Sequence, residues 1–355
     1  MASGGDDGYL WITDLDTGSR QKVSTKQECV VEVKWLPYAQ ASGVVEIITA
    51  GADGTCKLWR KAGRENNFKR VASVSVMSQS IESIAFENNR LGVVGRGGVF
   101  LYRIDRSTSS VFVSIPGDLE ETEGGEVNED GVPRWIGFSK GGKEVMIGML
   151  DTRVLMAWNV ESQRRLWRER LESRIGNCAW NESTATLLVW TLQDGVDVYK
   201  INDRPQFVFK LSLNIQRNFP IQMAFIDEKR FVSGSDNGEA LIWDLEGEEG
   251  HYQFDPIVVS SVGVGTKRGS GTTHLFVACG SSEPYRSGTV YIWTTNKNHM
   301  LVPQAPTVFE ETSEKVIRSL GVPPGLVEEI PPMLVIGAAV SLAVVLGGIL
   351  VVACL

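Results

Sequence analysis

Histidine is nearly absent from this sequence, with three residues in 355. Imidazole is the commonest metal ligand and a frequent general base, so its scarcity argues against most hydrolytic and metal-dependent chemistry. The sequence also shows no His/Glu spacing of a metalloenzyme, no nucleophile elbow and no phosphate-binding glycine loop between a strand and a helix. We therefore predict a protein that is not an enzyme and has no catalytic, cofactor-binding or metal-binding residues. We also expect no small-molecule substrate.

Paired cysteines and a secretory leader are missing as well. The five cysteines are isolated, and their spacing matches neither a disulfide framework nor a zinc site. The opening MASGGDDGYLW has neither a basic start nor an apolar stretch, so it does not read as a signal peptide. Both observations predict that the folded part lies in a reducing compartment, the cytosol.

Basic residues are fewer than acidic residues in this sequence. The formal net charge is −8, whereas proteins that bind nucleic acid usually carry a concentrated basic face, so we predict no nucleic-acid partner. Residues 117–131 hold seven acids and no Lys or Arg, which leaves a net charge of about −1 for the remainder. Two interpretations stay open for this insert: a solvated loop, or a docking site for a basic partner. The partner-binding candidates are Asp118, Glu120, Glu121, Glu123, Glu126, Glu129 and Asp130.

A repeated hairpin motif is what the sequence does contain. SGSDNGEALIWD, at 233–244, combines tight-turn residues with a short strand that ends in an aromatic residue. Copies of this unit recur along the chain at separations of 41 to 56 residues. The residues in the aromatic position are Thr13, Trp59, Tyr102, Trp158, Tyr199, Trp243 and Trp293.

Such a repeat predicts a ring. One hairpin unit cannot bury its own apolar face, so copies must stack on one another. A period near 45 residues with four short strands per repeat is typical of a propeller blade, and seven positions predict seven blades. We therefore expect an all-β fold, a seven-bladed β-propeller over residues 1–303.

The motif at 233–244 and the start ASGGDDG…DLDTG resemble the WD-repeat family. The resemblance implies a propeller that serves as a platform for other proteins, bound through its faces. The chain departs from the family because the usual Gly-His pair before each blade is essentially missing. The Asp-His-Ser-Trp network of the family therefore cannot be general here, and the Asp residues of the repeat are explained by turn formation.

The first blade is expected to be incomplete. Residues 2–5 look like the end of a second strand, and only YLWITDL and QKVSTK follow as strands before the next repeat. In the family, one terminus usually completes the blade that the other begins. No convincing pair of strands follows residue 303, so we expect the missing strands to lie upstream of Met1.

Arginines cluster in one outer strand, RRLWRER, at Arg164, Arg165, Arg168 and Arg170. Charge on an outer strand protects an exposed sheet edge, which is the first interpretation. The alternative is that this strand faces anionic lipid or the acidic surface of a partner.

The C-terminal region has a different character. Residues 304–332 read as a linker that contains a short helix at 313–320, with Ser313 as N-cap and Gly321 after its end. Residues 333–355 carry no charge, and as a helix they would measure about 34 Å, enough to cross a bilayer core. We predict a transmembrane helix that acts as a tail anchor. Glu328 and Glu329 precede it and no basic residue follows, which favours the ER or a later secretory membrane over mitochondria.

The function that follows is a membrane-tethered scaffold for protein–protein interactions, with the propeller in the cytosol. Two alternatives stay open. A cytosolic WD-type propeller followed by one membrane span also resembles in layout the ER guanine-nucleotide exchange factor of the small GTPase that initiates COPII coats. The second alternative is a soluble WD-repeat adaptor.

Overall fold

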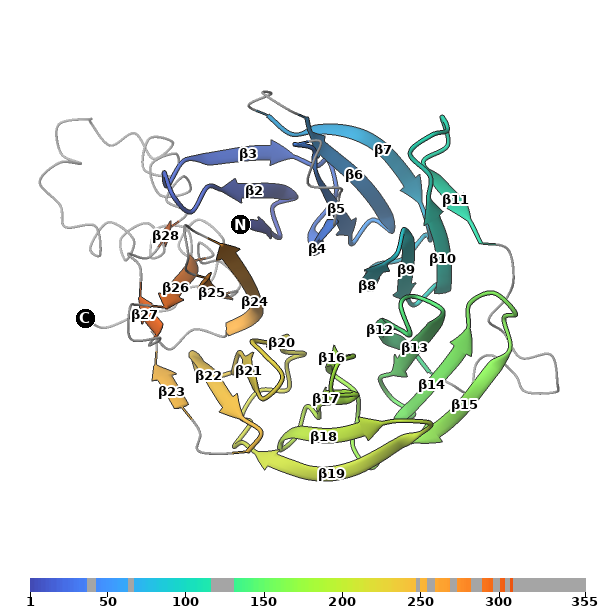
Figure 1. Cartoon of the computed structure of the whole chain (residues 1–355), viewed down its shortest axis with the longest axis vertical. Coiled ribbons are helices and arrows are strands. Elements are labelled where there is room, and N and C mark those ends of the chain that lie inside the picture. The colour runs from blue at the N-terminus through green and yellow to red at the C-terminus, as the bar shows by residue number, and fades with distance from the viewer. Residues whose placement is uncertain are drawn as a thin grey trace, which may run out of the picture.

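Seven antiparallel sheets form a ring in the computed structural model (Figure 1). The structure describes residues 1–36, 43–62, 67–115, 131–246, 250–253, 259–268, 273–281, 289–295, 301–303 and 307–308. Each sheet is a meander, so consecutive strands pair and the sheet runs from the centre of the ring to its outer wall. The predicted all-β, seven-bladed propeller is confirmed.

The strands follow chain order around the ring. Sheet one contains β1 (Ala2–Gly4), β2 (Tyr9–Thr13) and β3 (Arg20–Ser24). Sheet two contains β4 (Val30–Leu36), β5 (Val45–Gly51), β6 (Thr55–Lys61) and β7 (Lys69–Ser75). Sheet three contains β8 (Ile81–Glu87), β9 (Arg90–Gly95), β10 (Gly98–Ile104) and β11 (Phe112–Ser114). Sheet four contains β12 (Pro133–Ser139), β13 (Glu144–Met149), β14 (Val154–Asn159) and β15 (Arg165–Arg170).

The remaining sheets complete the ring. Sheet five contains β16 (Asn177–Asn181), β17 (Thr186–Trp190), β18 (Gly195–Ile201) and β19 (Pro205–Ser212). Sheet six contains β20 (Met223–Phe225), β21 (Arg230–Ser233), β22 (Glu239–Asp244) and β23 (Gly250–Gln253). Sheet seven contains β24 (Val259–Arg268), β25 (Thr273–Ser281), β26 (Thr289–Thr295), β27 (Leu301–Pro303) and β28 (Thr307–Val308).

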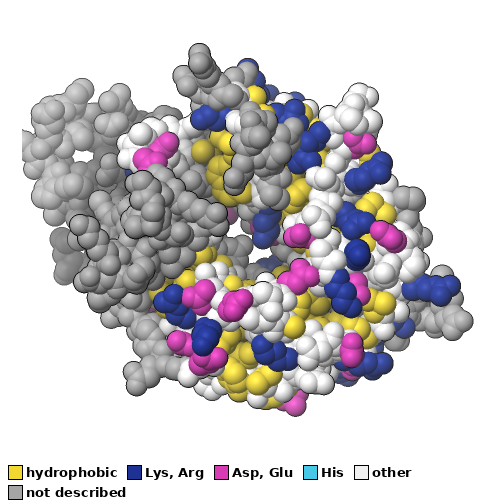
Figure 2. All heavy atoms as spheres, viewed as in Figure 1, with side chains coloured by type: hydrophobic (Ala, Val, Ile, Leu, Met, Phe, Trp, Pro, Cys, Tyr) yellow, Lys and Arg dark blue, Asp and Glu magenta, His cyan; other side chains and the backbone are white. Residues whose placement is uncertain are grey.

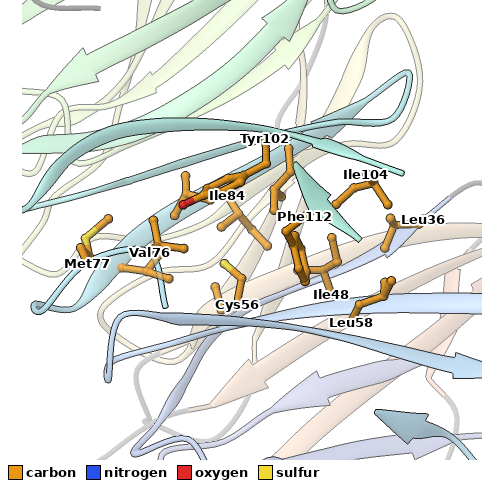
Figure 3. Packing of buried hydrophobic residues seen from close by; sticks show 14 residues of the cluster. Leu36, Ile48, Cys56, Leu58, Val76, Met77, Ile84, Tyr102, Ile104 and Phe112 are labelled. Atoms are coloured by element: carbon orange, nitrogen blue, oxygen red, sulfur yellow. The ribbon is translucent and has the colours of Figure 1, made fainter. Parts of the chain in front are cut away.

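Apolar side chains between neighbouring sheets form the core. Between sheets two and three, Ile48 and Leu58 meet Ile84 and Tyr102, all of them buried (Figure 3). Similar clusters lie between the following sheets. The second strands are buried along nearly their whole length, whereas the outer strands alternate. This pattern arises because a sheet packed on both faces buries every side chain of its inner strands.

The turn between β5 and β6 lies close to the connection that follows its sheet, and glycine makes this possible. Gly54, in this turn, has φ +73°, and a Cβ added there would lie 2.0 Å from the carbonyl oxygen of Met77, in the connection between β7 and β8. Only glycine satisfies both the conformation and the contact. This turn glycine therefore sets how closely the connection to sheet three approaches the hairpin of sheet two.

Sheet one has three described strands, one more than YLWITDL and QKVSTK alone would give. Its inner strand β1 pairs with β2, with Ala2 opposite Ile12. The last described strand, β28, pairs with β26 of sheet seven and not with sheet one. In the described part of the chain, no strand stands inside β1. The expectation of an incomplete first blade stays a prediction.

The predicted C-terminal elements lie almost wholly outside the described residues. This applies to the linker at 304–332 except β28, to the helix at 313–320 and to the transmembrane helix at 333–355. In the residues that the structure does describe, no helix is long and apolar enough to cross a bilayer.

Candidate functional site

The seven repeat positions all lie on the third strand of their propeller unit. In sheet one this strand is β2, which ends at Thr13. The side chains of the first six positions are between 1% and 8% exposed, so they are structural residues that fill the space between sheets. Trp293 lies on β26, opposite Val277. The six side chains with a described exposure are therefore not available to a partner.

Sheet two contains a hydrogen-bond network that replaces the histidine-based one. The Trp59 indole N–H donates to Thr49 Oγ1 at 3.0 Å, and the Thr49 hydroxyl donates to Gln27 Oε1 at 2.8 Å. Gln27 Nε2 then donates to the Thr55 carbonyl at 2.9 Å. Gln27 lies in the connection between sheets one and two. Its amide both donates and accepts a hydrogen bond, as a neutral imidazole would.

Asp236 does not cap its own turn, contrary to the sequence-based interpretation. Its Oδ2 accepts a hydrogen bond from the Gln216 amide at 2.6 Å and another from the Arg217 amide. Asp236 is 4% exposed, and its carboxylate binds backbone amides of the connection that leads into sheet six, not those of its own turn. The physical reason is that these two backbone N–H groups point inward with no strand partner. A charged acceptor satisfies both. Asp53, by contrast, does bind its own turn through the Thr55 amide and hydroxyl.

The meander order gives the ring two different rims. We call one the crossover rim, because it carries the connections between sheets together with the turns between second and third strands. The other, the hairpin rim, carries the remaining turns. On the crossover rim, the connection 213–222 is held from both sides: Asp236 binds its first half, and the Trp190 indole N–H donates to the Phe219 carbonyl at 2.9 Å. Ile221 anchors its end in the core.

This fixed loop presents an aromatic side chain to solvent. The Phe219 side chain is 44% exposed although its backbone is tied down by Trp190, and Asn218 beside it is exposed. A rigidly held aromatic residue on a rim is the kind of group that dominates binding energy at interfaces, because little conformational entropy remains to be lost. Phe219 is therefore the strongest described candidate for a partner contact on the crossover rim.

Charged residues line the centre of the ring. Figure 2 shows an opening there with acidic and basic side chains around it. Bulges in the inner strands β8 and β12 fall at Glu82 and Arg134, and these two side chains form an ion pair. Arg134 Nε also donates to the Gly176 carbonyl at 3.2 Å. A bulge turns a side chain out of the regular alternation of a strand. Here it lets Glu82 and Arg134 bond each other and lets Arg134 reach Gly176, so these contacts join sheets three, four and five.

A buried carboxylate joins sheets two and three. Glu46 is fully buried, and its two oxygens lie 2.7 Å from Arg60 and 2.7 Å from Arg106. Arg106 also donates to Asn89 Oδ1 at 2.6 Å. Two guanidinium groups compensate for the desolvation of one carboxylate, which makes this cluster an electrostatic connection between neighbouring sheets.

The predicted acidic site lies outside the described residues. All seven acids of the insert fall within 116–130, between β11 and β12. The flanking residues Ile115 and Gly131 belong to a connection of the crossover rim. The sequence-predicted arginines lie on sheet four: Arg164 is exposed in the turn before β15, and three others are exposed on β15 itself.

The described residues gather no group of three metal-ligating side chains. The four described cysteines are free thiols. Burial, followed by a hydrogen bond to Asp6, raises the pKa of Cys29 to about 12, which leaves the thiol protonated at neutral pH. Burial also raises the pKa of the Cys56, Cys178 and Cys279 thiols.

No protein-family model matches the chain, and no curated protein matches it in sequence. Among solved structures, a chain of the mitotic checkpoint complex is similar in fold, with a TM-score of 0.53 and 11% sequence identity. The match covers 68% of this chain and 70% of that one. The chain is a seven-bladed β-propeller, and this likeness shows the fold alone. A fold alone does not specify a function.

Three features escaped sequence reasoning. Gln27 carries no motif, because its role depends on lying opposite Thr49 after folding. Glu46 stands in a strand pattern that does not mark it as buried. Its burial is explained by the proximity of Arg106 from the next sheet. Phe219 could have been noticed: it stands before a proline in a long connection between two predicted strands, where an apolar side chain has no strand to cover it.

Proposed function

We propose that this protein is a scaffold for protein–protein interactions, tethered to the cytosolic face of an ER or secretory membrane. The observation that carries the scaffold assignment is the fixed connection 213–222, which displays Phe219 on a rigid ring. The membrane part of the proposal is supported by residues 333–355, which contain no charged side chain in 23 positions. A tether raises the local concentration of bound partners at the membrane.

The crossover rim is the docking face in this proposal. Its connections have fixed backbones, so a partner meets an organised surface and loses less entropy on binding. Ile115 and Gly131, which flank the acidic insert in the sequence, belong to a connection of this rim. In this proposal a partner with basic side chains contacts the insert while an apolar pocket of that partner receives Phe219.

Site-specific crosslinking tests the docking face. A benzophenone side chain placed at Phe219 should capture a partner in cells, whereas the same group at Phe207 should not. Phe207 is the matched control, because it is also a phenylalanine and is 47% exposed, but on the outer wall of sheet five. Phe219→Ala should abolish co-purification of the captured protein, and Phe207→Ala should preserve it. Equal capture at both positions would contradict the assignment.

Alkaline carbonate extraction of cell membranes tests the tether. The full chain should remain in the membrane pellet, and a variant with Val345→Arg and Leu346→Arg should move to the supernatant, because two charges in mid-span oppose insertion. Recovery of the unmodified chain in the supernatant would refute the tether and favour the soluble adaptor.

A further inference from the structure

The outer wall of the ring has the opposite charge to the chain as a whole. The outermost strands of the seven sheets contain eight Lys and Arg residues and one acid, Glu169, whereas the whole chain has a net charge of −8. Edge protection explains isolated charges on outer strands. It does not explain why half of these cations stand on two adjacent strands, β3 and β7.

The cations of β3 and β7 form one continuous surface. Arg20 and Lys22 on β3 and Lys69 and Arg70 on β7 are all exposed, and neither strand contains an acid. The two strands lie next to each other along the ring (Figure 1). The Phe68 amide at the start of β7 donates to Gln21 Oε1 of β3 at 3.3 Å, which ties the strands together. We call these four side chains the cationic wall.

Apolar and aromatic groups accompany the cationic wall. Val71 is 39% exposed beside Arg70. The Lys22 ammonium lies 4.3 Å from the ring centroid of Tyr9 and 4.9 Å from that of Trp11, and both rings are partly exposed. Cations mixed with Tyr and Trp are the composition that proteins place at the lipid headgroup level.

The acids nearest in sequence are Asp14 and Asp16, in the turn before β3. Asp14 accepts hydrogen bonds from the amides of Asp16 and Thr17, and these bonds shape that turn. The turn belongs to the hairpin rim, at the end of the cationic wall. The two strands themselves contain four cations and no acid.

We propose that the cationic wall docks on the surface of an anionic lipid bilayer. This inference rests on the membrane tether proposed above. The chain continues for 47 residues beyond Val308 and ends in the uncharged stretch 333–355. Val308 belongs to sheet seven, which is the neighbour of sheet one in the ring (Figure 1). Residues 309–332 span at most about 80 Å, so the tether keeps the wall within reach of the membrane that holds the tail.

The second cationic strand of the outer wall, β15, fits this role less well. Its arginines are interrupted by Glu169, which pairs with Arg204 at 2.6 Å. Sheet four also stands across the ring from sheet seven, where the described chain ends (Figure 1). The arginines of β15 are therefore the internal control for the cationic wall.

Energy transfer between a fluorescent dye on the full chain and rhodamine-labelled lipid tests the proposal. The dye is attached at Ser73→Cys, an exposed position on β7, in a background with Cys29→Ser and Cys354→Ser. In vesicles with 20% phosphatidylserine, transfer should be at least twofold higher than in pure phosphatidylcholine. The increase should disappear in 0.5 M NaCl, because screening then acts within about 4 Å. A dye at Ser212→Cys on β19, in sheet five, should respond weakly.

Charge removal identifies the surface. Arg20→Gln, Lys22→Gln, Lys69→Gln and Arg70→Gln should each weaken the docking equilibrium by about fivefold, and the fourfold variant should lose the phosphatidylserine response. The variant with Arg165→Gln, Arg168→Gln and Arg170→Gln should keep it. Equal transfer in both vesicle types would overturn the proposal and would point to an acidic protein as the occupant. A response that survives in the fourfold variant would overturn it too.

Failure of the tether gives a different result. A chain without a membrane anchor would not float with pure phosphatidylcholine vesicles. If that chain still floated with phosphatidylserine vesicles at low salt, and the fourfold variant did not, the result would support lipid docking by the cationic wall and refute the tether. If the chain floated with neither type of vesicle, both the tether and the lipid docking of the cationic wall would be refuted.

Discussion

Sheets two and six perform the same structural task with different side chains. In both, the third-strand tryptophan donates to a hydroxyl on the second strand, Trp59 to Thr49 at 3.0 Å and Trp243 to Ser233 at 2.9 Å. In sheet two the network continues to Gln27, in the preceding connection. In sheet six Asp236 reaches the preceding connection instead. In both sheets the hairpin is held to the connection before it, and the two sheets use different side chains for this contact.

The same two sheets differ in how they pair the charged residues that stand opposite each other on their second and third strands. Glu46 stands opposite Arg60 in sheet two, and Arg230 stands opposite Asp244 in sheet six, so the signs are exchanged. Glu46 is fully buried and also binds Arg106 of sheet three. Arg230 is 48% exposed and pairs with Asp227 in its own hairpin. One pair joins neighbouring sheets, and the other stabilises a single turn.

The largest effect is expected at Glu46. Glu46→Gln leaves Arg60 and Arg106 without their carboxylate in a partly desolvated site, and removal of one member of a buried ion pair costs about 3 kcal/mol or more. Urea denaturation of the full chain in detergent should show this loss in the free energy of unfolding. A loss below about 1 kcal/mol would mean that solvent reaches the cluster and that charge does not join sheets two and three.

Asp236 comes next. Asp236→Ala removes a charged acceptor from the Gln216 and Arg217 amides, which should lower the free energy of unfolding by about 2 kcal/mol. Hydrogen exchange at these two amides should accelerate more than exchange at amides of sheet two. Because the same loop displays Phe219, crosslinking from position 219 should also fall. Unchanged exchange at residues 216 and 217 would separate Asp236 from the order of the loop.

Gln27 tests whether an amide replaces the missing histidine. Gln27→Ala removes the acceptor of the Thr49 hydroxyl and the donor to the Thr55 carbonyl, and should cost about 1.5 kcal/mol. Combined with Thr49→Val, it should show a coupling energy of at least about 0.5 kcal/mol, because the two side chains share one network. Gln27→His should lose less than Gln27→Ala, since imidazole also offers one donor and one acceptor. Strict additivity of the first two substitutions would contradict the network.

The sequence was informative wherever a rule acts within one repeat. The aromatic position, the Asn-Gly turn at 237–238 and the alternation of inner and outer strands all depend on neighbours within one sheet, so the seven sheets could be predicted. Contacts between a sheet and a neighbouring sheet or connection could not. Gln27 lies in the connection before the sheet that contains Thr49, and Arg106 belongs to sheet three while Glu46 belongs to sheet two. Such contacts carry no local sequence pattern, which is why Asp236 was interpreted as capping its own turn.

The smallest effect is expected at Arg230, and it completes the comparison with Glu46. Arg230→Gln removes an exposed ion pair within one hairpin, and pairs of this kind contribute about 0.5 kcal/mol or less. The change in the free energy of unfolding should therefore be several times smaller than that for Glu46→Gln, under identical urea denaturation. If Arg230→Gln destabilised the protein as much as Glu46→Gln, burial would not be the property that distinguishes the two pairs. The exchange of signs between sheets two and six would then be a consequence of strand pairing alone, and the role of Glu46 between sheets would have to be abandoned.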